Sequence, residues 1–330
     1  MFKLGYAMSS EEHSPLNLVE NARRAEQVGF EFALISDHFH PWVSNQGNSP
    51  FVWSVIGGIS QATEHLRLGT GVTCPTMRIH PAIIAHAAST AAAMMPGRFF
   101  LGLGTGENLN EHVLGDKWPN SDERLEMLEE AIEIIRLLWE GGEKSFSGDY
   151  YTVEDAQLFT LPEQAPPIYV AATGPEVLEL AANVADGLIT TDADEETIDT
   201  FREAGGDGKP KFVKLNVCWA ESEAEARQTY QQWWPTTGIS ARFHADLPTP
   251  SHFEDAVELM KGRVEIPPEI PLGPDMDKHL KMFQKVSRLG FDHLYIHQIG
   301  PEQEGFFKFY EKQIIPELAG QGLIEHEFAR

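Results

Sequence analysis

Short apolar runs alternate with amphipathic segments along almost the whole of this 330-residue chain. The pattern begins with an apolar run at residues 2–6, a helical periodicity from Pro15 to Val28, and a second apolar run from Phe32 to Ile35. Ser14 is a suitable N-cap for this helix, and Gly29 stands just past its end. Strands that alternate with helices pair in parallel, because a parallel connection needs a long crossover. The alternation therefore favours an α/β fold built on a parallel sheet.

The same alternation continues into the C-terminal part of the chain. Six further strands are predicted at 66–72, 99–102, 168–171, 187–190, 212–217 and 293–296, with helices over 50–63, 81–95, 121–139, 175–184, 195–204, 221–234, 276–289 and 301–318. Eight such units predict a (β/α)8 barrel of the TIM type, in which closure leaves no unpaired edge strand. A doubly wound open sheet is the alternative. Its nicotinamide-binding form is disfavoured, because no G-x-G-x-x-G motif follows the first strand.

Two segments interrupt the alternation. Residues 141–167, around Gly148-Asp149-Tyr150-Tyr151, predict a small hairpin. Residues 235–274 are rich in proline and predict an insertion that is partly helical over 253–261. We therefore expect one barrel domain over residues 1–330 with two excursions from it.

Composition excludes several classes of partner. The formal net charge of -25 argues against nucleic acid or an anionic membrane. There is no long apolar run and no signal-peptide pattern, so we expect a soluble, cytoplasmic protein. Cys74 and Cys218 have no metal-ligand spacing, which predicts neither a disulfide framework nor a metal site. The acid excess is also typical of a protein from a salt-loving host, because high salt screens self-repulsion.

Polar residues collect in the loops that follow the predicted strands. In a barrel these loops lie together at the C-terminal face, where active sites are built. The segment Ser36-Asp37-His38-Phe39-His40-Pro41-Trp42 follows the second strand and contains an acid, two imidazoles and an indole. Histidine titrates near neutral pH and serves in proton transfer, so we interpret this segment as the chemical centre. Taken alone, it fits a packed surface loop equally well.

Two later loops have patterns suited to a cofactor. Glycines alternate over 102–106 before Glu107, so the backbone there can approach a ligand closely. A carboxylate in that position serves as an acid where burial raises its pKa; the alternative is a flexible turn with an exposed Glu107. Small residues at 171–174 precede Pro175 at a helix start, where free N–H groups can hold a phosphate. A plain tight turn explains that pattern as well.

Several motifs, in order, resemble the luciferase-like flavin and deazaflavin superfamily. Within it, the chain most resembles the coenzyme F420-dependent glucose-6-phosphate dehydrogenase group, from the N-terminus to about Thr191. The motifs that carry the resemblance are Leu4-Gly5-Tyr6, Ser36-Asp37-His38-Phe39 with Pro41-Trp42, Gly102-Leu103-Gly104-Thr105-Gly106-Glu107 with Leu109-Asn110-Glu111, and Gly148-Asp149-Tyr150-Tyr151.

The resemblance implies a TIM-type barrel, usually dimeric, that binds the deazaflavin F420 at the C-terminal ends of the strands. Such a cofactor carries hydride chemistry, while the protein orients it and handles protons. By resemblance, His38 is the base that takes the alcohol proton and Glu107 protonates the deazaflavin or stabilises charge on it, although such families can exchange these two roles. Trp42 and Glu11 shape and polarise the pocket. Expected cofactor contacts are Asp37, Gly71, Val72, Cys74, Thr105, Gly106, Asn110, Thr173, Gly174 and Val177, with a non-proline cis peptide at Gly71-Val72.

Departures from the group concern the polar contacts. Gly71 stands where the sugar-phosphate enzymes have Ser, and Cys74 stands where they have Thr. The group also has a phosphate-binding Lys three positions beyond the Thr that matches Thr191, where this chain has Asp194. A carboxylate there repels a phosphate, and the candidate replacement cations are Lys261 and Arg263 in the proline-rich insertion. Thr191 and Asp194 are therefore assigned to the substrate site.

The sequence thus predicts an F420-dependent oxidoreductase that moves a hydride between a CH–OH or C=O carbon and the deazaflavin C5, working as a homodimer. The His-Phe-His-Pro-Trp form at 38–42 is shared with deazaflavin-dependent secondary alcohol dehydrogenases, so an unphosphorylated alcohol, sugar or carbonyl compound is at least as suitable a substrate as glucose 6-phosphate. The alternatives are a glucose-6-phosphate dehydrogenase proper, an FMN-dependent monooxygenase, and a non-catalytic deazaflavin-binding protein on the same barrel.

Overall fold

Eight parallel strands close into a barrel in this computed structural model, which describes residues 1–262 and 265–325. Around the barrel the strand order is β1-β10-β9-β8-β7-β4-β3-β2, and each neighbouring pair is parallel. The predicted (β/α)8 fold is confirmed. The strands are β1 (Lys3–Met8), β2 (Phe32–Ile35), β3 (Arg67–Thr70), β4 (Phe99–Leu103), β7 (Ile168–Ala171), β8 (Gly187–Thr190), β9 (Lys211–Val217) and β10 (His293–Gln298).

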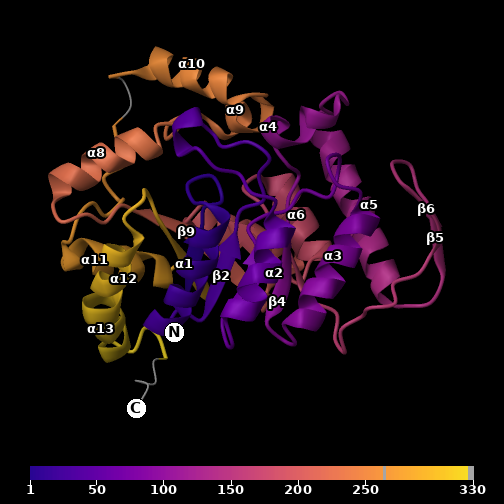
Figure 1. Cartoon of the computed structure of the whole chain (residues 1–330), viewed down its shortest axis with the longest axis horizontal. Coiled ribbons are helices and arrows are strands. Elements are labelled where there is room, and N and C mark those ends of the chain that lie inside the picture. The colour runs from indigo at the N-terminus through magenta and orange to yellow at the C-terminus, as the bar shows by residue number, and fades with distance from the viewer. Residues whose placement is uncertain (263–264, 326–330) are drawn as a thin grey trace.

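Helices cover the outside of the barrel (Figure 1). The first begins at Ser14, whose Oγ accepts the Asn17 N–H, and ends at Gly29, which adopts a left-handed φ of 102°. The helices are α1 (Pro15–Val28), α2 (Val52–Ala62), α3 (Pro81–Met94), α4 (Asn108–Glu111), α5 (Ser121–Trp139), α6 (Pro175–Val184), α7 (Glu195–Phe201), α8 (Glu223–Trp233), α9 (Ala241–Asp246), α10 (Pro250–Met260), α11 (Met276–Ser287), α12 (Gln303–Phe309) and α13 (Ile315–Gly320). Among the described residues, no helix has the length and apolar character needed to cross a membrane.

Two predicted helices are interrupted in the structure. The helix expected over 195–204 changes to a π-type turn at 202–206, where Gly205 has a φ of 104°. The helix expected over 301–318 is divided into α12 and α13 by a π-type turn at 310–314. Pro316 lies just beyond that turn and has no N–H to give to the carbonyl of Lys312, so regular α-helical bonding is lost there.

Aromatic side chains fill the barrel interior. Phe32, Phe100, Tyr169, Phe212 and Tyr295 form one buried cluster there. Glycines on neighbouring strands make room for the rings: a Cβ on Gly5 would lie 2.4 Å from the Phe32 ring, and one on Gly69 would lie 2.0 Å from the Phe100 ring. The barrel is therefore a packed core and not a channel.

Because side chains alternate between the two faces of a strand, the next inward positions lie above this aromatic layer, toward the C-terminal ends. In Figure 1 the helices α9 and α10, from the proline-rich segment, lie above the top of the barrel. The antiparallel pair β5 (Lys144–Ser147) and β6 (Thr152–Ala156) extends to one side beside α5. Helices α9 and α10 thus lie over the C-terminal ends of the strands, while the hairpin lies apart from them (Figure 1).

Candidate active site

A cavity of about 540 Å³ opens at the C-terminal ends of the strands. Volumes of this order suit a cofactor or a small molecule. All eight barrel strands, or the loops that follow them, contribute to its wall, together with α9 and the segments that flank it. Its polar and charged lining side chains are Ser9, Glu11, Ser36, Asp37, His38, Thr105, Glu107, Glu111, Thr173, Thr190, Thr191, Lys214, Asn216, His244 and His297.

His38 lies between two carboxylates. Its Nε2 is 3.2 Å from Glu11 Oε1 and 3.9 Å from Glu107 Oε2. Its Nδ1 is 3.2 Å from the His40 carbonyl, to which an Nδ1–H donates, so in the neutral ring Nε2 is the free acceptor. His38 can therefore take a proton at Nε2 and hold it against Glu11.

Glu11 is held in the ionised form by its surroundings. Burial by itself would raise the pKa of Glu11, but the neighbouring His38 and the hydrogen bonds from Ser36 and Ser9 lower it below its usual value. The Ser36 and Ser9 hydroxyls donate to Glu11 Oε2 at 2.7 Å and 2.8 Å. An ionised carboxylate here stabilises a protonated His38.

Asn110 fixes the loop of His38 relative to Glu107. Its Oδ1 accepts the backbone N–H groups of Phe39 and His40 at 2.9 Å and 3.2 Å. Its Nδ2 donates to Glu107 Oε2 at 3.1 Å. Asn110 is only 1% exposed and is absent from the cavity lining. Its position supports a role in orienting the two loops rather than in touching a ligand.

A buried ion-pair network lies beside the same loop. Arg78 Nη2 donates to Asp37 Oδ1 at 2.9 Å, and Arg78 Nε lies 3.5 Å from Glu111 Oε1. Asp37 also accepts the Thr73 hydroxyl at 2.8 Å. Burial raises the pKa of Glu111 to about 7, although Arg78 acts in the opposite direction. Asp37 is therefore tied to the protein on both oxygens while it faces the cavity.

Most of the site residues expected from sequence come together in the structure. Thirteen line this cavity: Glu11, Asp37, His38, Trp42, Gly71, Val72, Cys74, Thr105, Gly106, Glu107, Thr173, Val177 and Thr191. The Gly71–Val72 peptide is cis, as the resemblance implied. The Trp42 ring makes an edge contact with His38, with 4.9 Å between ring centroids.

Three expected residues do not line the cavity, namely Asn110, Gly174 and Asp194. Gly174 is the N-cap residue of α6. Asp194 is the N-cap residue of α7, and its Oδ1 accepts the Thr197 N–H at 2.8 Å. Its carboxylate is thus engaged by the helix start. Of the candidate cations in the proline-rich segment, Lys261 pairs with Glu258, and Arg263 lies outside the described residues.

Sequence reasoning missed the wall formed by β9 and β10. Lys214 and Asn216 on β9 face the cavity, and Tyr295 and His297 on β10 lie opposite them in the strand register. The signal was present in the sequence. Phe212, Lys214 and Asn216 alternate with Val213, Leu215 and Val217, a period of two that places polar groups on the inner face.

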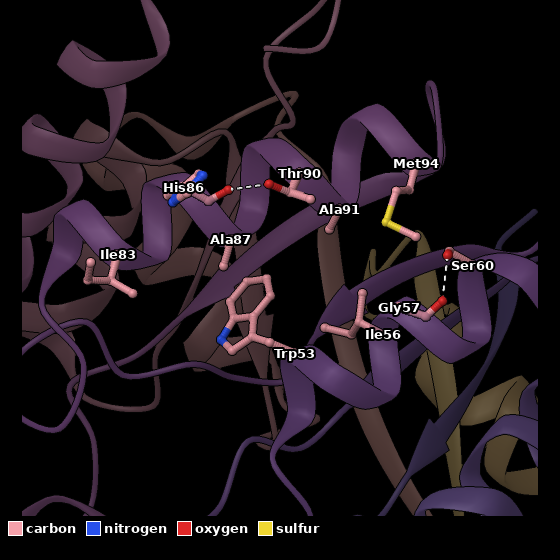
Figure 2. A pocket seen from close by; sticks show the side chains of 10 residues that line it. All are labelled: Trp53, Ile56, Gly57, Ser60, Ile83, His86, Ala87, Thr90, Ala91 and Met94. Carbon is pink, nitrogen blue, oxygen red and sulfur yellow. Dashed lines mark hydrogen bonds between the residues drawn. The ribbon is translucent and has the colours of Figure 1, made fainter. Parts of the chain in front are cut away.

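A second and smaller cavity lies outside the barrel, between α2 and α3, with a volume of about 240 Å³ (Figure 2). Figure 2 shows Trp53 and Met94 directed into the space between the two helices. Its lining has no Asp, Glu, Lys or Arg side chain. His86 is the one imidazole in this lining, and no carboxylate or Lys or Arg side chain lines the groove with it. Among the described residues, no cluster of three or more His, Cys, Asp or Glu is placed to hold a metal ion.

The barrel and the acid–imidazole cluster at its mouth define the class of protein: an α/β-barrel enzyme with a cofactor-sized site at the strand ends. The family described as luciferase-like monooxygenase matches residues 1–262. The chain belongs to this family.

Named relatives cover nearly the whole chain. The F420-dependent glucose-6-phosphate dehydrogenase of Microbacterium testaceum is 36% identical, over 96% of this chain and 97% of the relative. The F420-dependent glucose-6-phosphate dehydrogenase of Nakamurella multipartita is 34% identical, over 97% of this chain and 98% of the relative. A solved F420-dependent secondary alcohol dehydrogenase, in complex with an F420-acetone adduct, is 28% identical over 95% of this chain and 98% of that chain, with a TM-score of 0.86.

Proposed function

We propose that this protein is an F420-dependent oxidoreductase that moves a hydride between the CH–OH or C=O carbon of a small molecule and the deazaflavin. The observation that carries the proposal is the cluster of Glu11, His38 and Glu107 at the mouth of the barrel. The names of the relatives, which include both a sugar-phosphate and a secondary-alcohol dehydrogenase, support the same reaction class.

The cavity fits the cofactor in size and lining. Val72, Ala171, Val177 and Ile189 are apolar residues of its lining and can pack against a ring system. Thr173 and the start of α6 lie beside these residues, and α6 has no side-chain cap at Gly174, so its first N–H groups are free to hold a phosphate. When bound, the deazaflavin supplies the hydride acceptor or donor at its C5.

The protein's own residues handle the proton. In the oxidative direction the substrate C–H leaves as a hydride, its O–H proton passes to His38 Nε2, and a carbonyl forms. Ionised Glu11 stabilises the imidazolium that results. Glu107 is 35% exposed and lies on the solvent side of His38, where it can exchange a proton. Trp42 packs against the imidazole and limits the access of water.

The test is reconstitution with oxidised F420. Loss of the deazaflavin absorbance is followed with secondary alcohols, free sugars and sugar phosphates side by side. We expect bleaching with at least one hydroxyl compound. Retention of FMN instead of F420, or tight F420 binding without turnover across the whole series, would contradict the proposal.

We also propose that two copies associate through the groove between α2 and α3 (Figure 2). Ile83 and Met94, which line it, are 59% and 41% exposed, and the lining has no Asp, Glu, Lys or Arg side chain in a chain of net charge -25.

The mass measured by light scattering tests this association. We expect a dimer for the wild type and a monomer for Ile83→Glu. The matched control is Leu16→Glu on α1, which replaces an apolar side chain that is 81% exposed and absent from the groove lining. A monomeric wild type, or an Ile83→Glu variant that remains dimeric, would refute the assignment.

A further inference from the structure

Lys214 lies on the inner face of β9, two positions above the buried Phe212. It is the one Lys or Arg side chain in the lining of the large cavity, as far as the described residues show. Its Nζ lies 5.8 Å from the centroid of the Trp234 ring. None of the described residues accepts a hydrogen bond from this ammonium or forms an ion pair with it within 4.0 Å.

An ammonium has three N–H donors, and a charged group removed from bulk water is costly unless these are used. The Lys214 side chain is partly buried, and it faces the cavity instead of a protein acceptor. Ligand oxygen atoms are the partners that would complete its hydrogen bonding. Lys214 is thus a candidate ligand-binding group on the β9 wall of the cavity.

Further hydrogen-bonding groups lie beside Lys214. His297 Nδ1 is 3.3 Å from Asn216 Oδ1, and His297 Nε2 faces Glu12 Oε1 at 3.6 Å. In the described part of the chain, both His297 Nε2 and Glu12 Oε1 are buried without a hydrogen-bond partner. Asn216 and His297 line the cavity, whereas Glu12 lies behind them and pairs with His297. The Asn216 amide thus stands on the same wall as the Lys214 ammonium, and this wall suits a ligand with more than one oxygen.

Charge favours a neutral ligand over an anionic one. Burial lowers the pKa of Lys214, and the charges of Glu11, Glu107 and Glu12 act in the opposite direction. In the cavity lining this one ammonium is accompanied by the carboxyl groups of Glu11, Asp37, Glu107 and Glu111. A phosphate dianion would meet net repulsion here, whereas a hydroxyl oxygen can accept a hydrogen bond from Lys214 without adding charge.

Building on the proposed function, we propose that Lys214 determines specificity for a neutral polyhydroxylated substrate, an unphosphorylated sugar or polyol. Its ammonium donates to a hydroxyl oxygen other than the one that gives its proton to His38. A substrate with a single oxygen gains nothing from this contact.

The test compares the wild type with Lys214→Met, which keeps the side-chain length and removes the charge and the donors. Reduction of F420 is measured with D-glucose, D-mannitol, glucose 6-phosphate and cyclohexanol. Lys211→Met is the matched control on the same strand, because Lys211 lies outside the cavity and its Nζ is 3.5 Å from Asp292 Oδ2. Cofactor affinity is measured separately by F420 fluorescence.

We expect the wild type to have its highest kcat/KM with glucose or mannitol. Lys214→Met should lower that value by about 10- to 100-fold, mostly through KM, the range expected for a hydrogen bond to a charged group. Its kcat/KM with cyclohexanol and its F420 affinity should change less than about threefold, and Lys214→Arg should recover part of the polyol activity.

Three results would overturn the inference: a wild type that prefers glucose 6-phosphate, an equal loss of activity on all substrates, or a loss of F420 affinity. Absence of turnover with every substrate would instead contradict the proposed function. In that case saturation-transfer NMR with glucose and mannitol decides the question. Saturation-transfer signals of glucose or mannitol that are present with the wild type and Lys211→Met but lost with Lys214→Met would support the inference. The absence of these signals with the wild type would overturn it.

Discussion

Three contacts orient the His38 side chain. Its Nδ1 is oriented by the His40 carbonyl, its Nε2 faces ionised Glu11, and its ring packs against Trp42. Together these contacts fix the orientation of the imidazole ring, so Nε2 is positioned at the cavity before a ligand binds.

Replacement of His38 tests its role as the base. We expect His38→Ala to lower kcat by about 10²- to 10⁴-fold, the usual contribution of general acid–base catalysis. Glu107→Gln should lower kcat less severely, because Glu107 is half-exposed and a water molecule can replace it in part. His65→Ala, a change to an exposed histidine away from the cavity, is the control. Near-native turnover of both variants would contradict the assigned acid–base pair.

Glu111 should make stability depend on pH. Its pKa is raised to about 7 in the folded chain by burial, above its unfolded value of about 4.3. Folding then binds an extra proton between these values, so this group's favourable contribution is present below about pH 4 and is lost as pH rises through about 7.

Urea unfolding at several pH values measures this loss. Between about pH 5 and pH 8, the wild type should lose on the order of 1–3 kcal/mol more stability than Glu111→Gln. Glu179→Gln, on the exposed face of α6, is the control. Parallel pH profiles for the wild type and Glu111→Gln would show that Arg78 keeps Glu111 ionised throughout.

At the scale of elements, α9 and α10 form a cover over the barrel mouth that packs in a hydrophobic cluster of its own. Phe253 of α10 packs with Trp42, Leu109, Val43 and Ile239 in a cluster separate from the main core. The Phe253 and Trp42 rings make an edge contact with centroids 5.2 Å apart. The cover is thus connected to the catalytic loop through Trp42, and it can loosen without unfolding the barrel.

Truncation of Phe253 should loosen this cover locally. Phe253→Ala removes a fully buried ring, a change that costs about 3–5 kcal/mol in a core. We expect amide hydrogen exchange over 241–260 to become at least about tenfold faster, while amide exchange in the barrel strands stays unchanged. The KM for the substrate should increase. Leu259→Ala on the same helix is the control, because Leu259 is 77% exposed. Equal acceleration in the barrel strands would contradict a separate cover.

At the scale of the whole molecule, the main electrostatic feature is the excess of acidic over basic side chains. The chain has 25 Lys and Arg residues against 50 Asp and Glu residues, so half of the acids have no basic side chain to pair with. Many lie on the exposed faces of the outer helices, for example along α5. The folded state therefore carries a self-repulsion that salt can screen.

Thermal melts in KCl test this repulsion. Raising the salt from 0.1 M to 1 M shortens the screening length from about 10 Å to about 3 Å. We expect the melting temperature to rise by several degrees, with no such rise in a neutral osmolyte matched for osmolality. Equal melting temperatures in dilute and molar KCl would remove the support for a salt-loving host.

Sequence alone determined the order of the elements and much of the site. The segments Ser121–Trp139, Ile168–Ala171 and Pro175–Val184 have the predicted bounds, because helical and strand periodicity, N-caps and prolines act over a few residues. The loops after the strands converge in any barrel, so His38, Glu107 and Thr173 could be assigned to one cavity from their positions after strands.

Only the tertiary structure decided which of these groups meet and what they face. Asp194 was expected at the substrate but caps α7, and Asn110 orients two loops from behind the cavity. Lys214 and His297 are 83 positions apart, yet the parallel pairing of β9 with β10 places their strands side by side. Contacts of this kind arise from the pairing of distant segments and from burial, which no local pattern encodes.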